Sequence, residues 1–170
     1  MEYLDLYDWD RRPLNKKVSR GAKLKDGEYR LVVHACVFND KNQMIIQQRQ
    51  STKKFGGLWD LSVGGGVQAG ENSRQAIERE VFEEIGIQHD FSNERPYLTV
   101  NFDDGFDDMY IIFKNVSVEQ LKLQPEEVQN AKWATKEEII DKIKNNQFMP
   151  YHIGLIHALF DLQKNRGAFA

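Results

Sequence analysis

Apolar and polar residues follow two periods along the chain, one typical of strands and one typical of helices. Residues 3–7 alternate and then meet a turn-rich stretch, so residues 1–27 are predicted to form an N-terminal β-hairpin with a second strand at residues 18–24. Residues 29–38 form an almost continuous apolar run, which is typical of a strand covered on both faces. A polar turn then leads into a partner strand at residues 44–49.

Shorter strand signals follow in the second half of the chain. Residues 61–63 predict a short strand that leads into a run of glycines. Residues 97–102 and 109–116 predict a hairpin around residues 103–108, whose four aspartates are expected to lie in a solvated loop. Residues 128–133 predict a final strand.

Three segments carry helix signals. Asn72 or Ser73 can cap a segment without internal glycine or proline, and Gly86 supplies the usual left-handed terminator. Residues 135–144 begin in capping-box style, and residues 151–163 predict a C-terminal helix. This order of elements predicts an α/β fold in which helices cover both faces of a mixed sheet.

Composition narrows the class of protein. The chain has 170 residues, 41% of them hydrophobic and 29% charged, which suits a single globular domain over residues 1–170. A net charge of −3 argues against a general nucleic-acid binder. Because no apolar run is long enough for a membrane span and the first residues are acidic, we expect a cytoplasmic protein. Cys36 is the single cysteine and is predicted to be a buried strand residue.

Three glutamates on the first predicted helix provide the candidate chemistry. Glu80, Glu83 and Glu84 stand at i, i+3 and i+4, so their carboxylates are expected to emerge from one helix face. Like charges this close repel, and a divalent cation relieves the repulsion. Carboxylate oxygens without Cys or His favour Mg²⁺, with Mn²⁺ as a substitute, over zinc. The alternative is an exposed acidic face, the commoner fate of such glutamates taken alone.

Cationic side chains precede this helix. Arg49, Lys53 and Lys54 either lie on solvated surface or hold phosphate oxygens, and the guanidinium fork makes Arg49 the better phosphate ligand. The acidic residues 103–108 are an alternative source of a second metal ligand or a general base. His152 and His157 have no carboxylate partner in zinc-site spacing. His34 and His89 are expected to stand alone, and none of the four histidines is assigned chemistry.

The spacing within residues 65–87 is more specific than its composition. It follows the Nudix box: Gly, five residues, Glu, seven residues, Arg-Glu-aliphatic, one residue, Glu-Glu, one residue, Gly-aliphatic. Every specified position is met, by Gly65, Glu71, Arg79, Glu80, Val81, Glu83, Glu84, Gly86 and Ile87. The chain therefore resembles the Nudix hydrolases, which cleave a diphosphate bond linking a nucleoside phosphate to another group. The expected fold is a Nudix-like α/β/α sandwich.

This resemblance implies roles for the matching positions. Glu71 and Arg79 would pair to brace the loop on the helix. The proton of the attacking water would pass to Glu80 or Glu83, or in some relatives to a late loop for which Glu127 is the best match. The implied Mg²⁺ ligands are the carboxylates of Glu80, Glu83 and Glu84 and a backbone carbonyl at Gly64 or Gly65. The substrate is expected to be a small diphosphate, with Arg49 and Lys54 binding it, and a homodimer is left open.

The region before the box also resembles isopentenyl diphosphate isomerase, a Nudix relative that uses a cysteine and a histidine in a Ser-Val-Cys-Gly-His string. Here residues 62–66 read Ser-Val-Gly-Gly-Gly, so Gly64 and Gly66 replace the two functional residues. The isomerase's acidic ligands have matches in Asp107 or Asp108, so they do not separate the two activities. The sequence therefore predicts a hydrolase, with an isomerase and an inactive nucleotide-sensing module as alternatives.

Overall fold

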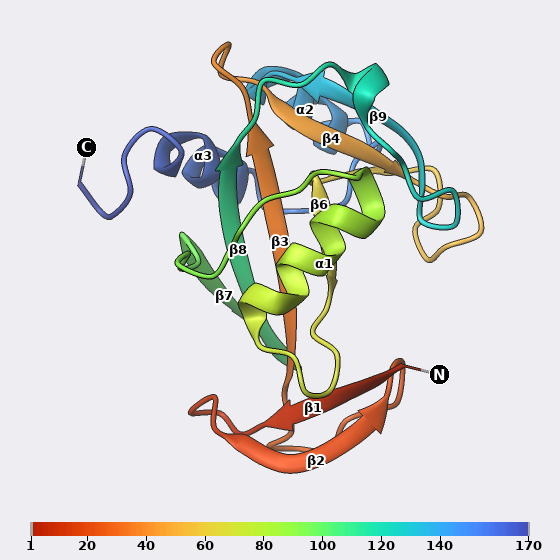
Figure 1. Ribbon diagram of the computed structural model, residues 1–170, viewed down its shortest axis with the longest axis vertical. Helices are drawn as coiled ribbons and strands as arrows, with labels where there is room; N and C mark the ends of the chain where they lie inside the picture. The colour runs from red at the N-terminus through yellow and green to blue at the C-terminus, as the bar shows by residue number, and fades with distance from the viewer. Residues whose placement is uncertain (1, 170) are drawn as a thin grey trace.

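A mixed β-sheet forms the centre of the structure, a computed structural model that describes residues 2–169 (Figure 1). Its central strand is β3 (Arg30–Phe38), whose apolar residues allow burial on both faces. β3 pairs in parallel with β8 (Gly105–Phe113) and antiparallel with β6 (Val63–Gly66). β7 (Leu98–Phe102) pairs with β8 and forms the edge.

β4 (Met44–Arg49) begins a second branch of the sheet. It pairs with β3 only at the residues Phe38 and Met44, and then pairs antiparallel with β5 (Trp59–Asp60) and β9 (Val128–Ala134). The hairpin predicted for β3 and β4 is thus limited to its first pair. The backbone groups of both strands are satisfied by other partners, so the two branches diverge from the turn.

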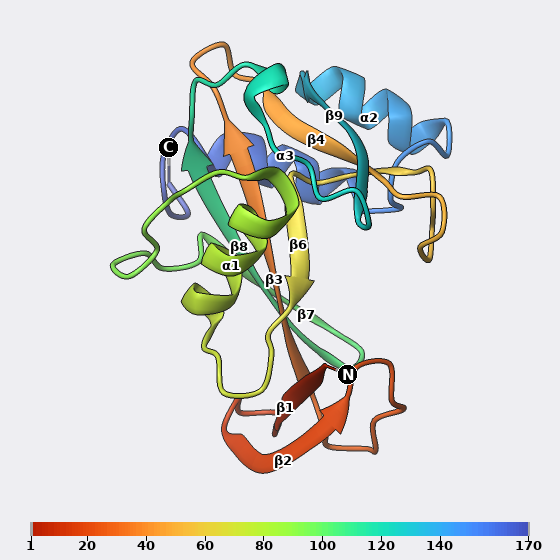
Figure 2. The same cartoon turned by 45° about the vertical axis from the view of Figure 1, so that its right-hand side comes forward.

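Helices lie on both faces of the sheet (Figures 1 and 2). α1 (Ser73–Ile85) covers one face, where Ile77 packs in a cluster with alternate residues of β3. α2 (Lys136–Lys144) and α3 (Ile153–Leu162) cover the other face, where Ile156 packs in a second cluster with Cys36 and Phe38 of β3. The predicted sandwich is confirmed, and the alternation along β3 explains the separate cores. Between β8 and β9 in the chain lies a short 3₁₀ helix, η1 (Val118–Gln120).

The helix boundaries follow the predicted caps. The Asn72 side chain accepts the backbone N–H of Gln75 at 3.1 Å, and Gly86 ends α1 with φ 71°. Thr135 and Glu138 form the capping box of α2. α3 is shorter than predicted because Tyr151 lies outside it, with its hydroxyl donating to a buried aspartate.

The N-terminal hairpin is present, but its second strand was placed wrongly. β1 (Tyr3–Tyr7) pairs with β2 (Pro13–Ser19), whereas the sequence indicated residues 18–24. Most of β2 is exposed and polar, so apolar alternation does not mark it. The hairpin lies beyond one end of the sheet, below β3 in Figure 1.

The glycine-rich strand differs from its prediction. β6 covers Val63–Gly66, so the glycines themselves form the strand that residues 61–63 were expected to form. Their backbone pairs with β3 over the residues Val32 to Ala35. Without side chains, this strand leaves room for groups that approach it from both faces of the sheet.

The predicted acidic loop is much shorter than residues 103–108. β8 already begins at Gly105, so Asp107 and Asp108 are strand residues. Asp108 is 1% exposed, and the Asp107 side chain is 13% exposed. The expectation of a solvated tip is wrong for these two aspartates, because each has buried partners from distant parts of the chain.

Two further expectations concern membrane-spanning segments and the burial of Cys36. Within residues 2–169, no helix combines the length and apolar character that crossing a bilayer requires. The cytoplasmic location stays a prediction. Cys36 is fully buried, as predicted, and burial raises the pKa of its thiol.

Candidate active site

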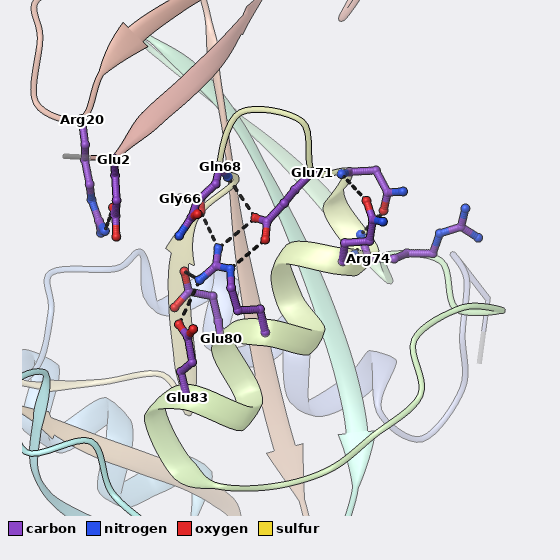
Figure 3. A network of polar contacts seen from close by, with 11 residues as sticks. Glu2, Arg20, Gly66, Gln68, Glu71, Arg74, Glu80 and Glu83 are labelled. Carbon is purple, nitrogen blue, oxygen red and sulfur yellow. Dashed lines mark hydrogen bonds and ion pairs between the residues drawn. The ribbon is translucent and has the colours of Figure 1, made fainter.

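Arg79 on α1 forms ion pairs with three glutamates, Glu71, Glu80 and Glu83, which Figure 3 labels. Its Nε lies 2.8 Å from Glu71 Oε1, and its Nη1 lies 2.8 Å from Glu80 Oε1 and 3.1 Å from Glu83 Oε2. Nη2 also donates to the Gly66 carbonyl at 3.2 Å. One guanidinium thereby connects the glycine strand, the loop after it and the helix.

Two of the three box glutamates turn inward. Glu80 and Glu84 are 7% and 5% exposed, whereas the Glu83 side chain is 45% exposed. Glu84 Oε2 accepts hydrogen bonds from Gln47 Nε2 at 3.0 Å and from the Gly64 backbone N–H at 3.4 Å. The i, i+3, i+4 spacing therefore gives two buried carboxylates and an outer one.

The buried carboxylates are poorly neutralised. Burial, and after it the negative charge of Glu80, raise the pKa of Glu84 to about 8. Burial also raises the pKa of Glu80, although Arg79 donates a hydrogen bond to it. Arg79 is shared with Glu71, whose hydrogen bond is the main reason that the pKa of Arg79 is raised. The helix face thus holds more negative charge than its neighbours offset.

The donor atoms at this face fit a hard divalent cation. Oε1 of Gln47 is buried and has no hydrogen-bond partner among the described residues. A Cβ at Gly65 would lie 2.1 Å from Glu80 Oε1, so the carboxylate rests directly against the bare backbone. Within residues 2–169, no three His, Cys, Asp or Glu side chains are already grouped as ligands. Arg79 holds Glu83 to one side and accounts for part of this.

The predicted substrate-binding cations have partners of their own. Arg49 Nη1 lies 3.0 Å from Asp60 Oδ2, and Arg49 Nε donates to the Lys54 carbonyl at 3.1 Å. Lys54 is exposed on the loop between β4 and β5. Lys53, on the loop between β4 and β5, forms an ion pair with Glu127, which directly precedes β9.

The N-terminal hairpin contributes a cation that the sequence did not indicate. Arg20 Nη1 pairs with Glu2 at 2.7 Å, beside the glycine strand in Figure 3. Burial lowers the pKa of Arg20, but Glu2 and the charges of Glu80 and Glu127 raise it overall. These effects place Arg20 within electrostatic reach of the box. No local pattern could have found it, because hairpin docking is a long-range event.

A second polar network includes His34 and Asp107, which lie on the opposite face of β3 and β8. His34 Nδ1 lies 2.8 Å from Asp107 Oδ1, and the Tyr151 hydroxyl donates to Asp60 Oδ1 at 2.9 Å. The Tyr151 oxygen lies 3.4 Å from His34 Nε2 and joins the two pairs. We call these four residues the closed network.

His34 was expected to stand alone, and this is wrong. Burial disfavours its protonation, but the charge and hydrogen bond of Asp107 outweigh burial and raise the pKa of His34 to about 9. The two residues come together through the parallel pairing of β3 with β8, which no sequence spacing predicts.

Comparison with known proteins identifies the family. The NUDIX domain profile matches residues 28–153. An uncharacterized Nudix hydrolase of Listeria monocytogenes is 43% identical over 164 residues, which cover 96% of each chain. The nucleoside triphosphatase NudI of Escherichia coli is 30% identical over 121 residues, covering 65% of this chain and 85% of that protein. The chain belongs to the Nudix family, and the prediction of a Nudix-type pyrophosphohydrolase is confirmed.

Solved structures show the same fold. The DR0079 protein of Deinococcus radiodurans superposes with a TM-score of 0.78 at 23% identity, covering 93% of this chain and 99% of that chain. A MutT protein of Methanosarcina mazei gives a TM-score of 0.64 at 23% identity, covering 81% of this chain and 96% of that chain. At these identities the likeness is one of fold.

Proposed function

We propose that the protein is a Mg²⁺-dependent hydrolase that cleaves a diphosphate linkage in a nucleoside diphosphate derivative or a related small molecule. One observation carries the proposal: Glu80 and Glu84 are buried side by side on the box helix with too little positive charge to neutralise them. The name of the relative NudI, a nucleoside triphosphatase, supports nucleotides as the class of substrate.

The proposed metal ligands are the Glu80, Glu83 and Glu84 carboxylates and the Gly65 carbonyl. Bound there, Mg²⁺ or Mn²⁺ would neutralise the diphosphate and lower the pKa of a water. The close contact between the Gly65 backbone and the Glu80 carboxylate supports both residues as ligands. The exposed Glu83 supports a third, because its side chain is free to rotate away from Arg79.

The chain's own residues hold the site and accept the proton. Arg79 and Glu71 fasten the loop after β6 to α1, which keeps the carboxylates at fixed positions. We assign proton acceptance to Glu80 or Glu83, and the raised pKa of Glu80 suits a general base. Glu127 is the alternative, and its ion pair with Lys53 holds it beside the loop that carries Lys54.

The remaining proposed contacts are with the substrate. Arg49 and Lys54 lie on β4 and the loop that follows it, where their charges would meet phosphate oxygens. Asp60 positions the Arg49 guanidinium at 3.0 Å, so part of its ordering is complete before binding.

Phosphate release from a panel of nucleoside diphosphate derivatives with Mg²⁺ tests the proposal. Kinetics of Glu83→Gln and Glu127→Gln separate the candidate bases, with the exposed neighbour Glu126→Gln as the matched control. A fully active Glu83→Gln enzyme would remove Glu83 as the base. Absence of cleavage across the panel with Mg²⁺ or Mn²⁺ would favour the nucleotide-sensing alternative.

One structural observation favours a hydrolase over the isomerase. A Cβ at Gly64 would lie 2.4 Å from the His34 ring, so a cysteine at this position requires the imidazole to move. His34 in turn is fixed by Asp107. Interconversion of isopentenyl and dimethylallyl diphosphate by the purified protein would overturn the hydrolase assignment.

Two predictions concern assembly. We propose a single domain over residues 1–170, because the family profile and the paired hairpin together span most of the chain. A homodimer stays open. Light scattering during size-exclusion chromatography distinguishes a monomer from a dimer.

A further inference from the structure

A pocket of about 820 Å³ lies between the first turn of α1, the segment before β7 and the turn of the N-terminal hairpin. Glu80, Glu83 and Glu84 are not among its lining residues. Its volume is in the range of roughly 300–1,000 Å³ typical of small-molecule sites. It is therefore large enough for a ligand of its own.

Three arginines around the pocket have no acidic partner: none of the ion pairs described between residues 2 and 169 includes Arg74, Arg95 or Arg166. Arg74 Nη1 donates to the Ser92 carbonyl at 2.7 Å, and Arg166 Nη2 donates to the Pro96 carbonyl at 2.9 Å. Neutral carbonyls orient these guanidinium groups without cancelling their charge.

The buried acid in the lining of the pocket is already satisfied. Asp108 forms an ion pair with Arg11 and accepts hydrogen bonds from Ser73 Oγ at 2.6 Å and Thr99 Oγ1 at 2.8 Å. Arg11 reaches it from a left-handed backbone conformation, φ 62°, that few residues other than glycine adopt. Asp108 is thus occupied, and Glu94, the other acid in the lining, lies 3.6 Å from His89 Nε2, so neither acid forms a described ion pair with the three outer arginines.

We propose that this pocket binds a phosphorylated small molecule through Arg74, Arg95 and Arg166, at a site separate from the box. Three guanidinium groups around one pocket repel each other, and an anion relieves the repulsion. A phosphate group offers three acceptor oxygens to the planar forks of arginine, one more than a carboxylate. The hydroxyls of Ser73 and Tyr110, which contact each other at 2.8 Å, provide further polar partners in the lining.

Calorimetric titration of the full chain with inorganic phosphate and with adenosine monophosphate tests this site. EDTA is present throughout, so metal-dependent binding at the box does not contribute. We expect saturable binding that Arg95→Glu weakens about 10-fold or more, because a charge-assisted contact becomes a repulsive one. Arg95 is exposed and its side chain makes no described hydrogen bond or ion pair, so the substitution leaves the fold intact.

Arg12→Glu is the matched control, since Arg12 is exposed, lies beside Arg11 and does not line the pocket. It should bind both probes like the unchanged chain. Glu84→Gln should also bind them normally, which separates this site from the proposed catalytic one. Unchanged affinity in Arg95→Glu, loss of binding in Glu84→Gln, or no saturable binding up to about 10 mM would each overturn the proposal.

Discussion

The two faces of the sheet at β6 differ in how completely their buried polar groups are paired. On the α1 face, Glu80 and Glu84 share Arg79 with other acids, and Gln47 Oε1 beside them has no partner among the described residues. In the closed network, which His34 and Asp107 enter from the α3 face, no buried side-chain nitrogen or oxygen lacks a hydrogen-bond partner among the described residues. The first face retains an electrostatic deficit that a cation can fill, and the second is complete without a ligand.

Adjacent glycines of β6 separate these environments. The position of a Cβ at Gly65 falls on the Glu80 carboxylate, and that at Gly64 falls on the His34 ring. Successive residues of a strand face opposite sides, so two neighbouring positions serve two different networks. The comparison suggests that substitutions on the α1 face change activity, whereas those on the α3 face change stability.

The largest expected effect is on the α1 face. Glu84→Gln keeps the shape and the hydrogen bond to Gln47 but removes a charge that would hold Mg²⁺. We expect kcat to fall by on the order of 1,000-fold, since the metal contributes several kcal/mol of charge stabilisation. The variant should unfold at no lower temperature than the unchanged chain in EDTA, because it loses a buried like-charge repulsion.

Steady-state kinetics and thermal melts of the same preparation check both statements. The exposed Glu126→Gln variant is the control for a neutralised glutamate outside the site. A Glu84→Gln enzyme with nearly normal kcat would show that the deficit on the α1 face has no catalytic role.

On the α3 face, Asp107→Asn should reverse this pattern. It removes the counter-ion that keeps the largely buried His34 protonated, which costs about 3 kcal/mol of unfolding free energy. Urea denaturation measures the loss. Asp103→Asn, on the exposed turn before β8, is the matched control. If Asp107→Asn is as stable as the control, the closed network does not stabilise the fold.

The acidic site could be predicted because its signals are local. Residues 65–87 contain the cap, the glutamate spacing and the terminating glycine, and the structure builds α1 from them. The closed network could not, because His34 and Asp107 meet only through the register of β3 with β8. Even Asp107 and Asp108, neighbours in sequence, face different networks. A polar run read without its strand register looks like a loop.

The pH dependence of stability tests the role of the closed network through a smaller effect than the Asp107 substitution. Asp107, with Asp60 and Glu84 behind it, raises the pKa of His34 to about 9 against the opposing effect of burial, while Tyr151 faces Nε2. Because the folded-state pKa is raised, the stabilisation is complete below the unfolded value of 6.5 and is lost as the pH rises through about 9.

Unfolding free energies at about pH 7 and about pH 9.5 should therefore differ by on the order of 2 kcal/mol from this residue. His34→Gln should remove that share of the difference, and the exposed His152→Gln should not. Equal slopes in all three proteins would show that His34 is not charged in the folded state. EDTA keeps the box free of metal during the measurement.

The smallest expected effects come from the glycine pair itself. In Gly64→Ala, the added methyl group meets the His34 ring, which Asp107 holds in place, so about 1–2 kcal/mol of stability should be lost to overpacking. In Gly65→Ala, the methyl group meets the end of the flexible Glu80 side chain, which can rotate away at little cost in stability. That rotation displaces a proposed ligand, so the Mg²⁺ concentration for half-maximal activity should rise about 10-fold. The two variants add the same methyl group at neighbouring positions of β6. If both lost stability and metal affinity to the same extent, the networks on the two faces of the sheet would not be independent.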